Sequence, residues 1–80
     1  MNRVVYIEFA RMLAHTKPIR NPTYSDESYN RALRLWNEIK ERIIEIFERD
    51  NALFDRRKFE KYIDRELEDL LNYTLGEINE

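Results

Sequence analysis

Few residues of this chain are of types that carry out chemistry by themselves. Its 80 residues include one histidine, His15, and no cysteine. The usual nucleophile–base pairs and metal clusters can therefore be assembled only from carboxylates or across a dimer. A single glycine is too few for a glycine-rich phosphate-binding loop. We predict a protein that is not an enzyme and that needs no metal or cofactor.

Two arrangements come nearest to a catalytic or metal site. Arg11 and His15 stand one helical turn apart, which is similar to the arginine–histidine pair of some helical ribonucleases. That family places more residues between the arginine and the histidine, and it has a polar residue after the arginine. The alternative is that His15 stands at a helix end because its positive form suits the negative end of the helix dipole. The acidic residues of the last predicted helix lack the alternating spacing of a calcium loop, so we expect them to be solvated. They are Asp64, Glu66, Glu68 and Asp69.

The charge order of the last predicted helix indicates a candidate binding site. Three cations crowd its first turn and a fourth follows one turn later, while acidic residues gather toward its far end. Both ends oppose the helix macrodipole, at a cost of about 0.3–1 kcal/mol per misplaced charge at low salt. Either solvent and acidic residues of the preceding helix (Glu41, Glu45, Glu48) neutralise this cluster, or it meets an acidic partner surface or phosphates. We predict a partner-binding site made of Arg56, Arg57, Lys58, Lys61 and Tyr62.

Nucleic acid is the alternative partner for this cluster, with Lys17 and Arg20 as further contacts. A basic helix start after a short turn is what a helix-turn-helix motif presents to DNA. However, the preceding helix is too long for that motif, the turn lacks glycine, and Glu60 and Asp64 would face the same groove. The net charge of −2 also provides no overall attraction to a polyanion. We therefore favour a protein partner.

The apolar periodicity predicts an all-α protein, a small three-helix bundle in one domain over residues 1–80. The helices are expected at about 4–15, 26–48 and 55–74, with the second and third antiparallel because their connection is short. Ser25 and Asp55 are suited to cap the second and third helices, and Gly76 to end the third. Residues 77–80 are expected to fray. Two prolines, Pro18 and Pro22, stiffen the first connection.

The second predicted helix carries a broad apolar face, listed here in chain order: Tyr29, Ala32, Leu33, Trp36, Ile39, Ile43, Ile46 and Phe47. Leu35 and Ile44 widen this face beyond the usual stripe. Because an 80-residue chain without disulfides or metal has a thin core, self-association is one way to complete it. We expect Leu35, Ile44 and some tyrosines to lie under a dimer mate or a host protein.

One stretch resembles a signature of small proteins from bacteriophage and bacterial genomes. Residues 47–59 match the pattern F-x-x-D-N-P-x-F-D-x-x-x-F, except that Ala52 stands where the pattern has proline. The Leu-x-x-Thr-Lys-Pro segment of those proteins resembles residues 13–18, and Trp36 matches their tryptophan before the middle helix. The similarity covers about residues 9–63, and the group's Ala-Cys-Gly ending is absent after Phe59. The resemblance implies a phage or mobile-element accessory protein that binds a host complex, for example as an inhibitor of a CRISPR effector or another defence complex.

The start of the chain is too short an apolar run, and too soon interrupted by Glu8 and Arg11, to be a signal peptide or membrane span. We therefore expect a cytoplasmic protein, in the host cytoplasm if a phage encodes it, with no membrane partner. Taken together, the residues predict a non-enzymatic module that binds a protein.

Overall fold

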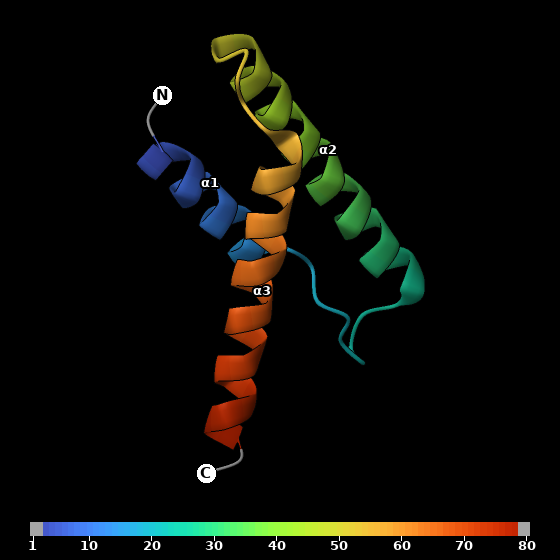
Figure 1. The fold of residues 1–80 in the computed structure, drawn as a ribbon. Helices are drawn as coiled ribbons and strands as arrows, with labels where there is room; N and C mark the ends of the chain where they lie inside the picture. The colour runs from blue at the N-terminus through green and yellow to red at the C-terminus, as the bar shows by residue number, and fades with distance from the viewer. Residues whose placement is uncertain (1–2, 79–80) are drawn as a thin grey trace. The chain divides into compact units, whose positions relative to one another are not determined.

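A computed structural model describes the backbone of residues 3–78 and the side chains of residues 3–72. The chain forms three helices, α1 (Arg3–Thr16), α2 (Asp26–Asp50) and α3 (Arg56–Ile78) (Figure 1). Over the described backbone there is no strand. The predicted all-α class with three helices is confirmed.

Local side chains set the starts of α2 and α3, as predicted. Ser25 is the N-cap of α2, and its hydroxyl accepts a hydrogen bond from the backbone N–H of Ser28 at 3.1 Å. Asp55 serves α3 in the same way, because its carboxylate accepts from the backbone N–H of Lys58 at 3.2 Å. Each side chain satisfies one of the backbone donors that a helix start leaves without a partner.

The end of α3 differs from the prediction. The helix continues through Gly76 to Ile78, so Gly76 does not end it and residues 77 and 78 belong to the helix. A glycine costs a helix about 1 kcal/mol relative to alanine but ends it only where the backbone turns to a positive φ. No described glycine has a positive φ. Residues 79 and 80 of the expected frayed tail lie outside the described residues.

The described chain divides into two compact units. One unit joins α1 up to His15 with α3, and the other consists of residues 16–54, which include α2. In the first unit, apolar side chains are buried on both helices, namely Ala10, Leu13 and Ala14 on α1 and Phe59 and Ile63 on α3. The small residues at positions 10 and 14 give α1 a flat buried face one helical turn long.

Within the second unit, the connection from residue 17 to Ser25 is held by its own turn and by aromatic rings of α2. Asn21 accepts from the backbone N–H of Thr23 through its side chain and from that of Tyr24 through its carbonyl. The ammonium of Lys17 lies 5.2 Å from the centroid of the Trp36 ring, and that of Lys40 lies 5.6 Å from it. The Trp36 ring therefore has two cations close to it.

The other end of α2 is closed by the turn that follows it. The backbone N–H of Asn51 donates to the Phe47 carbonyl, and the Asn51 side chain accepts from the backbone N–H of Leu53. The turn brings Phe54 back onto the helix, where its ring meets the Phe47 ring edge to face at a centroid distance of 5.4 Å. Asn51 thus has a structural role at the helix end.

The broad apolar face predicted for α2 is divided in the structure. Trp36, Ile44 and Phe47 are buried, so the expectation that Ile44 lies on an outer binding surface was wrong. Ile39 and Ile46, which belong to the same predicted apolar face, are exposed. The reason is geometric: the apolar residues span a wider arc of α2 than the contacts within the described chain cover.

Candidate binding surfaces

All five residues of the predicted binding site lie in the first two turns of α3, but they differ in environment. Arg56 pairs with Glu60 one turn later, with Nε 3.1 Å from Oε1. Tyr62 is half buried and lies near Arg11 of α1, with which it interacts electrostatically. Arg57, Lys58 and Lys61 are exposed. Among the described residues, the structure therefore separates three cations whose charged groups have no polar partner from two residues already engaged within the α1–α3 unit.

A fourth cation, Arg65, extends this group and was missed by the sequence prediction. Arg57, Lys61 and Arg65 follow one another at steps of four, so they share one side of α3, and Lys58 lies beside them. Among the residues whose side chains are described, none forms an ion pair or a hydrogen bond with the charged groups of these four side chains. We call Arg57, Lys58, Lys61 and Arg65 the basic row. Its signal in the sequence is the continued four-residue spacing.

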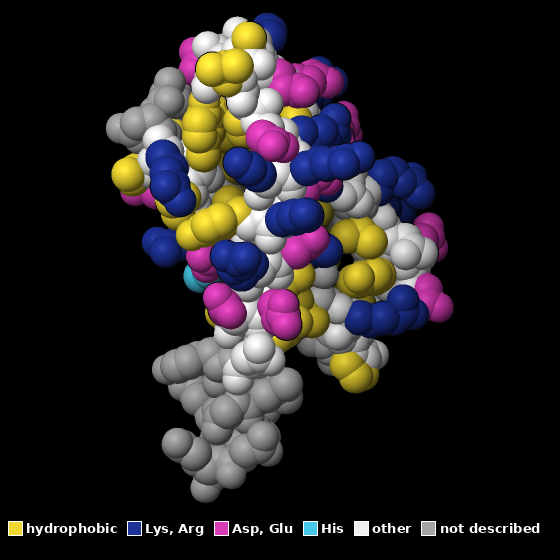
Figure 2. All heavy atoms as spheres, viewed as in Figure 1, with side chains coloured by type: hydrophobic (Ala, Val, Ile, Leu, Met, Phe, Trp, Pro, Cys, Tyr) yellow, Lys and Arg dark blue, Asp and Glu magenta, His cyan; other side chains and the backbone are white. Residues whose placement is uncertain are grey.

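The electrostatics of the basic row are unfavourable for the helix that carries it. Neighbouring cations repel one another at four-residue spacing, and the row begins where the helix dipole is positive. Asp55 offsets part of this charge as the cap of α3. Asp64 and Glu68 follow on nearby positions of the same exposed side, and Figure 2 shows acidic and basic side chains interleaved along α3. The surface is therefore of mixed charge, with the excess of cations at its start.

The position of α1 against α3 depends partly on an ion pair. The guanidinium of Arg11 lies 3.3 Å from the carboxylate of Glu66, and it joins the two helices across a sequence separation of 55 residues. The hydrogen bond to Glu66, followed by the charge of Glu66, raises the pKa of Arg11, and Tyr62 raises it further. Arg11 and Glu66 thus have a structural role. His15 stands exposed in the last turn of α1, as predicted.

A second surface lies on α2, where three branched aliphatic side chains face solvent. Leu35 is 58% exposed, Ile39 47% and Ile46 46%. We call these three residues the aliphatic row. It begins beside the exposed Ala32 and has Arg42 between Ile39 and Ile46. A shallow hollow at its end is lined by Ile46 and by charged residues, namely Arg42, Glu45, Glu48 and Arg49.

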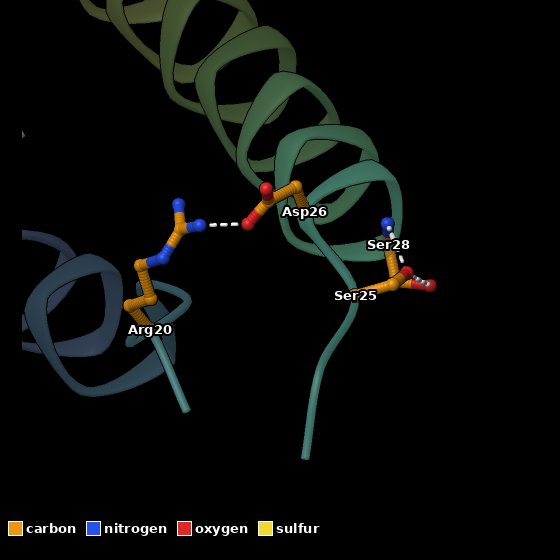
Figure 3. A network of polar contacts seen from close by, with 4 residues as sticks. All are labelled: Arg20, Ser25, Asp26 and Ser28. Carbon is orange, nitrogen blue, oxygen red and sulfur yellow. Dashed lines mark hydrogen bonds and ion pairs between the residues drawn. The ribbon is translucent and has the colours of Figure 1, made fainter. Parts of the chain in front are cut away.

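The further contacts suggested for nucleic acid, Lys17 and Arg20, belong to the unit that contains α2. The Lys17 ammonium lies over the Trp36 ring. The Arg20 guanidinium stands 5.3 Å from the centroid of Tyr29 and pairs with the Asp26 carboxylate, which Figure 3 shows beside the Ser25 cap. Both cations are therefore engaged in holding the connection to α2.

Over the part of the chain that the structure describes, no group of three or more histidine, cysteine, aspartate or glutamate residues is placed to hold a metal ion. None of the helices, over its described residues, combines the length and the apolar character that crossing a membrane requires.

No family model matches the chain, and no curated protein or solved structure matches it either.

Proposed function

We propose that this chain is a non-enzymatic protein-binding module that presents the basic row of α3 to an acidic surface of a partner protein. The observation that carries the proposal is the set of four exposed cations on one side of α3. Their mutual repulsion disfavours all four, and the positive end of the helix dipole also disfavours Arg57 and Lys58 in the first turn. Such an arrangement gains free energy when an acidic surface approaches, because the partner relieves the repulsion.

Two features favour a protein over a nucleic acid as the partner. Asp64 and Glu68 accompany the basic row and would be repelled by a regular array of phosphates, whereas a protein surface can place a cation opposite each of them. Lys17 and Arg20, which would have extended a phosphate-binding surface, are held by aromatic rings and by Asp26.

The resemblance of residues 47–59 to small phage proteins bears on where the partner comes from. A phage accessory protein acts on components of its host, so the proposed partner is a host protein or complex, with inhibition of a defence complex as the finer form of the proposal. Nucleic acid remains the second candidate function, since four cations over two helical turns are able to contact several phosphates.

A charge-reversal comparison tests the proposal. The chain is immobilised and used to capture proteins from a bacterial host lysate, in parallel with an Arg57→Glu, Lys61→Glu variant. Arg31→Glu, Arg34→Glu is the matched control, because it changes the charge by the same amount at exposed positions of α2. We expect a protein that the wild type and the control retain and that the α3 variant loses.

Duplex DNA retention on the same three proteins separates the two functions. Retention by the wild type that falls steeply with salt and is lost in the α3 variant would support nucleic-acid binding instead. Equal capture of the same proteins by the wild type and the α3 variant would contradict any role of the basic row.

A further inference from the structure

The aliphatic row of α2 has the spacing of a coiled-coil seam. From Leu35 the steps to Ile39, Arg42 and Ile46 are four, three and four residues, which is the alternation of a and d positions in a heptad. The buried residues of α2 lie on a different side of the helix, with Trp36, Ile44 and Phe47 at other heptad positions. The helix therefore has one apolar side used within the chain and a second that faces solvent.

The residues of this second side are placed symmetrically about the middle of α2. Leu35 and Ile46 are equally far from the midpoint between residues 40 and 41, and so are Ile39 and Arg42. If a second α2 lies antiparallel with its midpoint opposite the first, Leu35 of each copy meets Ile46 of the other. Ile39 meets the aliphatic stem of Arg42, whose charged end is left free to reach outward. The seam is thus complementary to itself in one register.

The charges beside the seam fit the same register. At a rise of about 1.5 Å per residue, Arg42 of one copy stands within about 1.5 Å, along the helix axis, of Glu38 of the other. The arrangement has twofold symmetry, so this ion pair forms twice. Both residues are exposed, and both lie on the edge of the aliphatic row that faces away from the buried side of α2.

We infer that the aliphatic row is a self-association surface, on which two copies of the chain pair through antiparallel α2 helices. Leu35–Ile46 contacts form at both ends of the seam and Glu38–Arg42 ion pairs form near its centre. A twofold seam uses the same patch on both copies, as most homodimers do. The inference rests on α2 alone and does not depend on the function proposed for the basic row of α3.

A charge-exchange experiment by sedimentation equilibrium tests this inference on the full chain. Glu38→Arg places two cations opposite each other in its own dimer, and Arg42→Glu places two anions there, so each variant alone should dimerise about tenfold more weakly than the wild type, which corresponds to about 1.4 kcal/mol. An equimolar mixture of the two variants restores both opposite-charge contacts between chains. We expect the mixture to form a heterodimer about as tight as the wild-type dimer.

The mixture distinguishes pairing between chains from pairing within one. Within each variant chain, residues 38 and 42 carry the same charge, so they can no longer pair at four-residue spacing on one helix. Mixing the two variants cannot restore that pairing within a chain. A chain that carries both changes provides a second measurement, since it should again form a homodimer like the wild type.

The aliphatic contacts have their own test with a matched control. Leu35→Gln with Ile46→Gln should abolish dimerisation, whereas Leu53→Gln, at a more exposed position in a turn, should leave it unchanged. Circular dichroism of every variant checks that the helices are retained. A wild type that stays monomeric at millimolar concentration would overturn the inference. So would single charge variants that dimerise like the wild type, or a mixture no tighter than the variants alone.

Discussion

The guanidinium Nε of Arg11 on α1 lies 3.3 Å from Oε1 of Glu66 on α3. Arg11 is largely exposed whereas Glu66 is mostly covered, so the pair is formed at the edge of the α1–α3 unit. The contact is not apparent from the sequence, in which Arg11 stands one helical turn from His15 and Glu66 belongs to an acidic group that was predicted to be solvated. Both residues have a structural role in the folded chain.

Glu66→Gln should lower the thermal unfolding midpoint, because it removes the charge that pairs with Arg11 and keeps the shape of the side chain. The loss should shrink at about 1 M salt, where the Debye length is only about 3 Å. Thermal unfolding followed by circular dichroism at low and high salt measures it. Glu68→Gln, an exposed change on the same helix, is the control and should have no comparable effect.

The pH dependence of this effect follows from the raised pKa of Arg11. A cation whose pKa is raised by folding stabilises the folded chain fully below its unfolded pKa, and that stabilisation is lost only as the pH rises through the folded value. Both values of an arginine lie far above neutrality. The difference between wild type and Glu66→Gln should therefore stay constant between about pH 6 and 9, and a clear decline over that range would contradict the assignment.

Asp55→Ala should destabilise the chain by about 1 kcal/mol, within the usual range of about 0.5–2 kcal/mol for loss of an N-cap. The Asp55 carboxylate accepts the backbone N–H of Lys58 and offsets part of the basic charge at the start of α3. Asp55→Asn keeps the hydrogen bond and loses the charge. Urea unfolding of both variants separates the two contributions, and the capping role would be refuted by an alanine variant as stable as the wild type.

Phe47→Ala should cost about 3–5 kcal/mol, which is a large part of the total stability expected of a domain this small. The Phe47 side chain is 1% exposed and meets the Phe54 ring. Leu53→Ala, at a side chain that is 90% exposed, is the contrasting change and should be nearly neutral. Similar losses in the two variants would mean that the turn after α2 is packed differently.

Lys17→Gln should loosen the connection between α1 and α2, because it removes one of the two ammonium groups close to Trp36. A cation–π contact at a partly exposed site contributes about 0.5–1 kcal/mol. Trp36 is the only tryptophan of the chain, so quenching of its fluorescence by acrylamide reports on the cover of this ring. We expect stronger quenching in Lys17→Gln and unchanged quenching in Lys58→Gln.

The features that the sequence predicted correctly are mostly local. Ser25 and Asp55 cap their helices through atoms three residues away, and apolar periodicity identified all three helices. Which part of the apolar arc of α2 is covered depends on contacts distant in sequence, so Ile44 was predicted on an outer surface although it is buried. Gly76 was read as a helix end because glycine permits a positive φ, although it does not require one.

The candidate site was predicted in part. The crowding of Arg57, Lys58 and Lys61 near the start of the helix is visible in the sequence, whereas Arg65 lies two turns further on, beyond the part of the helix where the dipole acts. The pairing of Arg56 with Glu60 is consistent with their four-residue spacing. The aliphatic row required exposed fractions, which no periodicity supplies.

The division of the chain into units has a consequence for the order of folding. The α1–α3 unit is built from two segments that are far apart in the sequence, and the Arg11–Glu66 contact closes a loop of 55 residues. Residues 16–54 instead make contacts close in sequence, such as Phe47 with Phe54. Non-local contacts require the larger loss of chain entropy before they form. We therefore expect the α2 segment to gain structure first and to shorten the loop that α1 and α3 must close.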